Sequence, residues 1–386
     1  MQDQILLAHG SGGVLSHELV RDVFARHFSN PFLDDLGDAA LVGELPPGRL
    51  ALTTDSYVVQ PLFFPGGDIG KLAVCGTVND LAMAGARPLY LTAGFILEEG
   101  LPLETLEHVV ASMAETAREA GVLIVAGDTK VVEHGAADGL FINTAGVGVV
   151  PPGVDLSPAY LRSGDALLIN GPVGDHGLAV MLQREGLAFQ STLQSDVAPL
   201  HGLIAALLDA VPGQVRCMRD ATRGGLATVL NEWVLPPSIP PEGGEDGVPE
   251  GYVAGYTPIP PKGGEVSPGG QKAPPISPPL GGTKGGKIGI QIAETAIPVR
   301  EAVRAACEFL GLDPLYAANE GKVVIAVAAE AAEAALSTLR AHPLGREAAL
   351  IGRVTAEHTG RVVLRTPYGA RRILPMLTGA QLPRIC

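Results

Sequence analysis

The stretch PPGVDLSPAYLRSGD, residues 151–165, divides the chain into two parts of similar kind. It is rich in Pro, Gly and short polar residues, a composition typical of a connection between structural units. The chain has 386 residues, more than one ordinary hydrophobic core supports. We therefore place a domain boundary here, with a first domain over residues 1–150 and a second over residues 151–378.

The part before this stretch reads as a mixture of helices and strands. The segment 103–121 (LETLEHVVASMAETAREAG) has the apolar spacing of an amphipathic helix that Gly121 ends. Helical spacing with small residues also marks GKLAVCGTVNDLAMAGA, residues 70–86. Strands are predicted at ALTTDSYVV (51–59), VLIVAGD (122–128) and LFINTAGVGVV (140–150).

The part after it restarts with a strand, ALLIN (166–170), a glycine turn, GPVGDHG (171–177), and a helix. Helices are further predicted at 223–233, 297–311 and 331–342, and strands at 287–294, 322–330, 361–366 and 371–376. The sequence shows no regular strand–helix–strand rhythm and no dinucleotide-binding fingerprint. An α+β fold is therefore expected rather than a doubly wound sheet.

Residues 235–287 differ in composition from the rest, because about half of them are Pro or Gly. Such a composition predicts a disordered or polyproline-like insertion within the second domain. A tolerated surface loop is the first interpretation, since long exposed insertions cost little stability. Docking of a partner is the alternative.

Charge and cysteine content limit the classes of function. The formal net charge of −14 argues against a nucleic-acid surface and against binding to anionic membranes. The four cysteines, Cys75, Cys217, Cys307 and Cys386, form no CxxC pair, so neither a zinc site nor a disulfide framework is predicted. A reducing cytoplasm is the expected location. MQDQILLAHGSGG does not resemble a signal peptide, and no apolar run approaches ~20 residues.

Aspartates in the first domain lie beside small residues where the chain is expected to bend: Asp38, Asp55, Asp80 and Asp128. Carboxylates that converge in space hold Mg²⁺, which bridges the oxygens of a polyphosphate. Lys130, two residues after Asp128, would stabilise phosphoryl charge. Taken singly, each aspartate is better explained as a turn or helix cap, and only the four together favour a ligand site.

Glycine-rich and loop segments supply further candidates. The backbone amides of AHGSGG (8–13) are able to cradle a phosphate. His176, in GDHG, is the histidine best placed for a site. In RDATRGGL (219–226), Asp220, Thr222 and Arg223 precede a helix start, which favours anions, although simple capping explains them as well.

Two further residues are candidates for chemistry. Glu320 lies in DPLYAANEGK (313–322), on a predicted loop between a helix and a strand. A carboxylate there serves as a general base if burial raises its pKa, and helix capping is the competing explanation. Cys386 is the last residue of QLPRIC, at a mobile position where an exposed thiol is prone to oxidation.

Eleven motifs, taken in order, closely resemble the HypE family of hydrogenase maturation factors: HGSGG, GDAA, TTDSYVV, NDLAMAGA, GDTKVV, GDHG, TRGGL, IPVRE, LDPLYAANEGK, HPLGR and the terminal PRIC. The resemblance covers nearly the whole chain except 235–287. TRGGL and the aspartate loops are shared with aminoimidazole-ribonucleotide synthetase, selenophosphate synthetase and thiamine-monophosphate kinase. PRIC together with HGSGG is specific to HypE.

The resemblance implies a two-domain aminoimidazole-ribonucleotide synthetase-like fold whose first domain pairs into a homodimer. ATP and Mg²⁺ would bind between the domains. A carbamoyltransferase, HypF, would load the terminal cysteine with a carbamoyl group. ATP-dependent dehydration would then give a thiocyanate, whose cyano group passes to iron on a HypC–HypD complex for a [NiFe]-hydrogenase.

The same resemblance suggests residue roles. Cys386 would be the carried substrate on a flexible tail, residues 379–386, which reaches up to ~26 Å when extended. Glu320 would be the base, and Lys130 would stabilise the transferring phosphoryl group. The expected Mg²⁺–ATP ligands are Asp38, Asp55, Asp80 and Asp128, with Gly12, Asn79 and Lys130 also contacting the nucleotide.

Two other functions remain open from the sequence. One is a small-molecule kinase or selenophosphate synthetase of the same fold, although no reactive cysteine lies near the N-terminal glycine loop. The other is a carrier without catalysis that only presents Cys386 to partners. ATP hydrolysis that depends on Asp80 and Lys130 would exclude the pure carrier.

Overall fold

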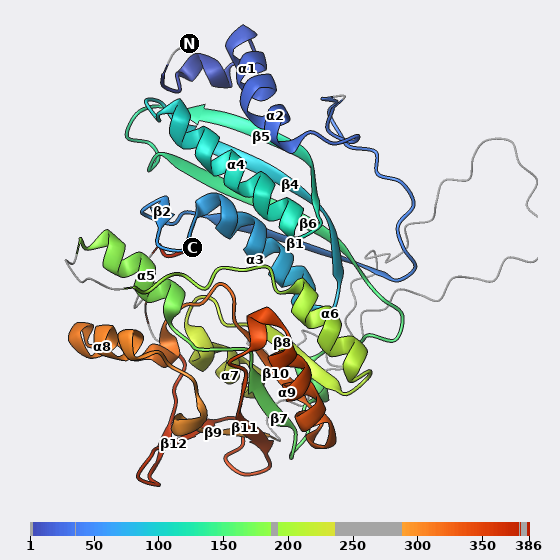
Figure 1. Cartoon of the computed structure of the whole chain (residues 1–386), viewed down its shortest axis with the longest axis vertical. Coiled ribbons are helices and arrows are strands. Elements are labelled where there is room, and N and C mark those ends of the chain that lie inside the picture. The colour runs from blue at the N-terminus through green and yellow to red at the C-terminus, as the bar shows by residue number, and fades with distance from the viewer. Residues whose placement is uncertain (1–2, 35, 187–191, 236–287, 378, 380–383) are drawn as a thin grey trace, which may run out of the picture.

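The computed structural model describes residues 3–34, 36–186, 192–235, 288–377, 379 and 384–386. Two mixed sheets with packed helices form two halves, as the expected α+β fold requires (Figure 1). The predicted insertion at 235–287 lies outside the described residues, apart from Leu235. Within the described chain, no helix is long and apolar enough to cross a membrane.

The first half is built on a four-stranded sheet of order β1-β6-β4-β5. β4 pairs in parallel with β5, and the other neighbours are antiparallel. The elements are β1 (Arg49–Tyr57), β4 (Arg87–Glu98), β5 (Leu123–Val132), β6 (Leu140–Val150), α3 (Ile69–Met83) and α4 (Leu103–Glu119). α3 and α4 pack side by side on one face of the sheet (Figure 1).

Local sequence explains where these two helices begin and end. The carboxylate of Asp68 accepts hydrogen bonds from the backbone N–H of Gly70 at 2.7 Å and of Lys71 at 3.2 Å, which caps α3. Gly121, just after α4, has φ of +64°, the left-handed conformation that ends many helices. The other helices of this half are α1 (Val14–Leu19) and α2 (Arg26–Phe28), with a π-helical turn, η2 (Val20–Ala25), between them; β2 (Phe63–Phe64) and β3 (Gly67–Asp68) form a small hairpin.

The second half is built on a seven-stranded sheet of order β13-β12-β9-β11-β7-β10-β8. Its strands are β7 (Ala166–Ile169), β8 (Val215–Asp220), β9 (Gly289–Ala293), β10 (Val323–Val327), β11 (Ala349–Thr355), β12 (Val362–Arg365) and β13 (Arg371–Ile373). Its helices are α5 (Asp175–Arg184), α6 (His201–Ala210), α7 (Gly225–Val234), α8 (Glu301–Leu310) and α9 (Ala332–Ala341). Single turns of 3₁₀ helix connect these elements and open the chain: η1 (Leu7–Gly10), η3 (Pro158–Tyr160), η4 (Glu294–Ala296), η5 (Pro314–Tyr316), η6 (Ala329–Ala331) and η7 (Pro343–Gly345).

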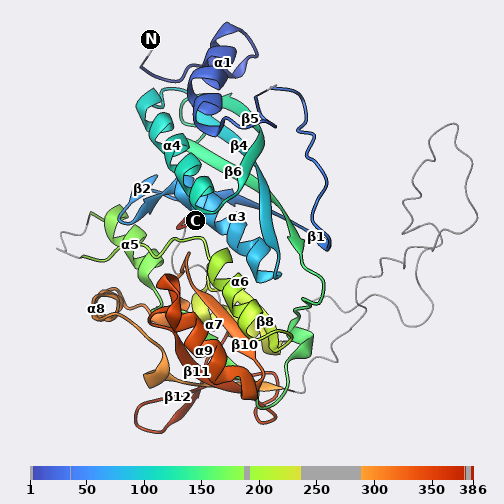
Figure 2. The same ribbon diagram turned by 45° about the vertical axis from the view of Figure 1, so that its right-hand side comes forward.

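The two halves are joined along α3. Ala82, near the end of α3, is fully buried in a core cluster with residues of α6 and of the second sheet. The amide of Asn79 donates to the backbone oxygens of Ala198 at 3.1 Å and Glu320 at 3.2 Å. It also accepts the N–H of Leu200 at 2.7 Å. These bonds place the second half directly against α3 (Figure 2).

Candidate functional site

An acidic cavity of about 370 Å³ lies where the two halves meet. Each half contributes charged residues: Asp55 from β1, Asp80 from α3, Asp220 from the end of β8, Arg223 from the loop before α7, and Glu320 from the loop before β10. Cys386, the last residue of the chain, also lines this cavity. Figures 1 and 2 show the C-terminus beside α3, between the two halves.

The carboxylates in this cavity repel one another. Burial and the charge of Asp80 raise the pKa of Asp55 to about 6. Burial, again with Asp80, raises the pKa of Asp220 to about 7. Arg223 opposes the shift at Asp55 but does not cancel it. A cavity that holds this much unbalanced negative charge favours a cation or a cation-bound ligand.

The position of Arg223 depends on the glycines that follow it. Gly224 and Gly225 have φ of +77° and +60°, a conformation that other residues adopt only with strain. A Cβ on Gly225 would lie 2.6 Å from the backbone oxygens of Leu315 and Ala317. The TRGG sequence therefore allows a tight turn at the start of α7, and Arg223, just before this turn, lines the cavity with the carboxylates.

Glu320 is a buried carboxylate of the cavity. The residue is 4% exposed, and its Oε1 is buried with no hydrogen-bond partner among the described residues. Burial, with repulsion from Asp220, raises the pKa of Glu320 well above its ordinary value. An unpartnered buried acceptor is costly unless a ligand supplies the missing donor. The condition set by the sequence argument for a base at this position, burial that raises the pKa, is present at Glu320.

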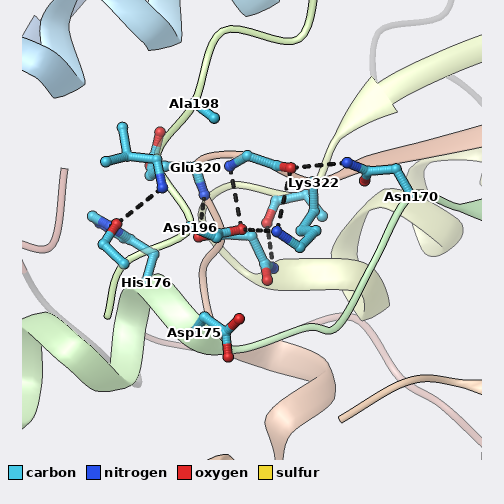
Figure 3. Close-up of polar contacts among 12 residues, drawn as sticks. Asn170, Asp175, His176, Asp196, Ala198, Glu320 and Lys322 are labelled. Atoms are coloured by element: carbon cyan, nitrogen blue, oxygen red, sulfur yellow. Dashed lines mark hydrogen bonds and ion pairs between the residues drawn. The ribbon is translucent and has the colours of Figure 1, made fainter. Parts of the chain in front are cut away.

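The backbone around Glu320 is held from several sides (Figure 3). The carboxylate of Asp196 accepts the backbone N–H of Glu320 at 3.1 Å and of Gly321 at 3.3 Å. It also pairs with the Lys322 ammonium at 2.8 Å, and both side chains are nearly buried, 4% and 10% exposed. Burial alone would raise the pKa of Asp196, but Lys322, together with His176 and the backbone N–H of Glu320, lowers it. The loop that carries Glu320 is therefore rigidly placed.

The last three residues of the chain are docked between the halves. Val58 N–H donates to the backbone oxygen of Cys386 at 3.2 Å, and Gln60 N–H to that of Arg384, also at 3.2 Å. The Arg384 guanidinium pairs with Asp138. Ile385 is 3% exposed and belongs to the core cluster of the first half. Burial raises the pKa of the Cys386 thiol to about 12, and the negative charge of Glu320 adds to the effect.

Four of the predicted site residues lie in a different cavity, of about 390 Å³, between β5 and the N-terminal helices. They are Gly12, Asp38, Asp128 and Lys130. Lys130 pairs with Asp128 at 2.8 Å, with both side chains largely exposed. Within one chain, the four predicted aspartates therefore form two groups, Asp55 with Asp80 and Asp38 with Asp128, and do not all converge on one site.

Two other candidate residues, Asn79 and His176, make hydrogen bonds to the chain's own backbone rather than facing the acidic cavity. Asn79 is 1% exposed and uses both amide N–H groups on the second half, so its side chain is not free to contact a nucleotide. His176 is fully buried, and its Nε2 lies 2.6 Å from the backbone oxygen of Ile385. It contacts the docked tail rather than lining the acidic cavity.

The donor set of the acidic cavity is compatible with Mg²⁺, which prefers carboxylate oxygens and usually completes its shell with phosphate and water. The described residues contain no cluster of three or more metal-ligating side chains close enough to hold an ion alone. Asp55, Asp80 and Asp220 would thus act as partial ligands to a cation that arrives with a nucleotide. The pKa values of Asp55 and Asp220 are raised partly by the neighbouring carboxylates. A bound cation would offset this repulsion.

The sequence interpretation did not identify several residues of the site. RDATRGGL indicates Asp220 only as part of a helix start that favours anions, and does not reveal that its carboxylate lies near Asp55 and Asp80. Ser195 and Asp196 carried no recognisable signal in STLQSDVAPL (191–200). Only the folded chain brings them beside His176 and Glu320.

Family models match both halves. The N-terminal domain of AIR synthase related proteins matches residues 36–150, and the C-terminal domain of the same family matches residues 162–236 and 283–365. The second match is interrupted within the Pro/Gly-rich segment that the sequence predicts as an insertion.

Individual relatives match over nearly the full length. The chain is 51% identical to the carbamoyl dehydratase HypE of Azotobacter vinelandii over 98% of this chain and 96% of the relative. It resembles a crystal structure of the hydrogenase maturation protein HypE in complex with ATP, at 47% identity, 99% coverage of each chain and a TM-score of 0.81. It also resembles a chain in a HypE–HypF complex, at 44% identity, with 93% of this chain and 99% of that chain covered and a TM-score of 0.70.

Proposed function

The chain belongs to the HypE family of AIR synthase-related proteins, and we propose that it is a carbamoyl dehydratase that acts on its own terminal cysteine. The reaction serves hydrogenase maturation and uses ATP, as the relatives' names and the ATP complex support. The observation that carries the proposal is the position of Cys386 in one cavity with Glu320, Asp55, Asp80 and Asp220. Substrate thiol and acid–base groups thus meet at one place.

The chemistry follows from these neighbours. A carbamoyl group on Cys386 is a thiocarboxamide, S–C(=O)–NH₂. Reaction with ATP gives the thiocyanate S–C≡N, ADP and phosphate, because the amide oxygen leaves on the phosphoryl group and the nitrogen loses both protons. Glu320 has a free, buried Oε1 and is the base that takes the last N–H proton. Arg223 supplies positive charge in the same cavity for the phosphoryl oxygens.

Magnesium is part of this proposal. Asp55, Asp80 and Asp220 would hold it together with nucleotide oxygens, and when bound it neutralises polyphosphate charge. The roles predicted for Asp38, Asp128, Lys130 and Gly12 remain a proposal, and in one chain these residues line the other cavity. They would reach a reacting phosphoryl group only if the nucleotide or a second chain connects the two cavities.

The proposed reaction needs a partner that donates the carbamoyl group to Cys386 and a partner that accepts the cyano group from it. HypF is the proposed carbamoyl donor, supported by the HypE–HypF complex of a relative. A HypC–HypD complex is the proposed acceptor of the cyano group, supported by the family resemblance alone. The four cysteines are free thiols, which fits the reducing cytoplasm that we propose as the location.

An intact-mass spectrum tests the function directly. Incubation with active HypF and a carbamoyl donor substrate should add one carbamoyl group, and Mg²⁺–ATP should then remove one water, with both changes mapping to Cys386. The Cys386→Ala variant should show neither change, while Cys307→Ala, a buried thiol elsewhere, should behave as the parent. A tail that stays unmodified beside active HypF would refute the proposal and favour a small-molecule kinase.

A homodimer is proposed from the exposed edge of the first sheet. β1 is an edge strand, and Leu50 and Leu52 on it are 59% and 74% exposed. Apolar side chains along an unpaired edge favour pairing with a second copy.

The Leu52→Lys substitution is expected to shift the protein to monomer, because it places a charge in that proposed interface. Light scattering with size-exclusion chromatography measures the mass. The control, Tyr368→Lys, changes an aromatic residue that is 97% exposed in the second half and should leave the mass unchanged. An unaltered dimer in the Leu52→Lys variant would place the interface elsewhere.

A further inference from the structure

Docking of the tail relies on one buried histidine as well as on β1. His176 is fully buried on α5, and the ring of Phe64 from the first half packs edge-on against it at 5.4 Å. Its Nε2 lies 2.6 Å from the backbone oxygen of Ile385. A carbonyl oxygen only accepts, so Nε2 carries the proton and donates. This hydrogen bond is made to the backbone of the tail and does not involve the Cys386 thiol.

Ser195 fixes this form of the histidine. Its Oγ lies 2.8 Å from His176 Nδ1 and accepts the backbone N–H of Val197 at 3.1 Å. The hydroxyl proton is therefore available for Nδ1, which accepts it. The backbone N–H of Ser195 in turn donates to Pro65 of the first half at 2.7 Å. Ser195 thus determines which ring nitrogen faces the tail.

The next residue, Asp196, binds the backbone of the loop that carries Glu320, the proposed base. Its carboxylate accepts the backbone N–H of Glu320 and of Gly321, and Lys322 locks it in place (Figure 3). Ser195 and Asp196 are adjacent in sequence, and one supports the docked tail while the other supports the Glu320 loop. Ser195 reaches the tail through His176, and Asp196 reaches the base through its backbone.

We propose that the Ser195–Asp196 dipeptide is a positioning element that sets the place of the docked tail relative to Glu320. This inference rests on the proposed function, in which Cys386 is the substrate and Glu320 the base. Neither Ser195 nor Asp196 lines the acidic cavity, so neither touches the reacting atoms. The contacts made by His176 and Ser195 are independent of what the sulfur carries, so the same element accepts the free, carbamoylated and cyanated tail.

The first test measures docking without any catalysis. The rate at which iodoacetamide alkylates Cys386 in the full chain is followed by intact mass at pH 8. The other three cysteines are buried, which leaves Cys386 as the accessible thiol. His176→Phe removes both hydrogen bonds of the ring, and should raise the alkylation rate at least about tenfold, because a freed thiol regains an ordinary pKa of ~8.5.

Conservative variants distinguish a role of His176 in positioning the tail from a general loss of folding. In His176→Gln the amide N–H is able to donate to the Ile385 oxygen, so this variant should recover much of the parental protection. Ser195→Ala should show an intermediate rate. The control, His201→Phe on α6, changes a partly buried histidine away from the tail and should alkylate like the parent. Equal rates in the parent and in His176→Phe would overturn the proposal.

The second test measures single-turnover loss of water from the carbamoylated chain. His176→Phe and Asp196→Asn should both slow this step at least about tenfold. Asp196→Asn should leave the alkylation rate near the parental value, because its contacts are to the base loop and not to the tail. A thermal melt checks the folding of each variant. Lys322→Arg keeps the positive charge beside Asp196, so this variant should retain most of the dehydration rate if Asp196 acts by position.

The two proposals fail in distinguishable ways. If the parent chain itself loses no water, the proposed function is wrong, and the alkylation rates still decide whether His176 holds the tail. If the parent reacts and Asp196→Asn reacts equally fast, the coupling of tail and base through this dipeptide is wrong while the function stands.

Discussion

The Glu320→Gln variant is expected to accept a carbamoyl group on Cys386 and to bind ATP, but to lose water from the loaded tail about 10²–10⁴-fold more slowly than the parent. Gln keeps the size of the side chain and leaves the backbone contacts to Asp196 unchanged. It removes only the carboxylate that takes the N–H proton. Single-turnover intact-mass measurements after loading report the two steps separately.

Stability gives an independent readout of the same substitution. Burial raises the pKa of Glu320 in the folded chain. The free energy of unfolding of the parent therefore falls as pH rises above the ordinary carboxyl pKa, because the unfolded chain ionises this group more easily. Gln carries no charge. The melting temperature of Glu320→Gln relative to the parent should therefore be higher at pH 8 than at pH 5.

Glu301→Gln, an exposed residue on α8, is the matched control and should change neither the dehydration rate nor the pH dependence of melting. A Glu320→Gln variant that dehydrates at the parental rate would show that another group is the base. Asp220, whose pKa of about 7 suits a base near neutral pH, would then be the residue to replace.

Lys322→Met is expected to destabilise the protein by about 3–5 kcal/mol, because it leaves the buried Asp196 carboxylate without its counter-charge. Asp196 and Lys322 are 4% and 10% exposed at their side chains, so solvent cannot replace the missing partner. Urea denaturation followed by tryptophan fluorescence suits the measurement, since Trp233, the one tryptophan in the sequence, lies in the core of the second half.

An exposed ion pair serves as the comparison. Lys130 pairs with Asp128 at the same distance, 2.8 Å, but both side chains are mostly exposed, 65% and 69%. Lys130→Met should therefore cost less than about 1 kcal/mol. Asp196→Leu combined with Lys322→Met should not restore stability, because Asp196 also satisfies two backbone N–H groups that Leu would leave unpaired. Similar midpoints for the two lysine variants would show that the buried pair is not a stabilising contact.

Periodicity in the sequence predicted most of the elements that carry the site. The helix at 103–121 and the strand at 51–59 correspond to α4 and β1, because their apolar spacing reflects burial on one side. β4 was not predicted, although it is central in the first sheet. Its residues alternate between buried and half-buried positions, and small residues such as Ala93 and Gly94 weaken the pattern.

Contacts distant in sequence explain what could not be predicted. The spacing of Asp55, Asp80 and Asp220 gives no measure of their separation, and their convergence depends on α3 packing against β8. Asp38 and Asp128 look equivalent to them in sequence but lie at the other cavity. Ser195 and Asp196 follow no motif, and their role depends on which residues α5 and the Glu320 loop bring near them.

Docking of Ile385 also affects how well a partner captures the tail. Burial of an isoleucine side chain contributes about 1.5–3 kcal/mol, so Ile385 alone would leave roughly 1–10% of chains with the tail released at any moment. A partner that binds only the released form then shows an apparent affinity about 10–100-fold weaker than its intrinsic one. Substitution of Ile385 by alanine would therefore tighten capture of the tail by a partner while weakening its occupancy of the chain's own cavity.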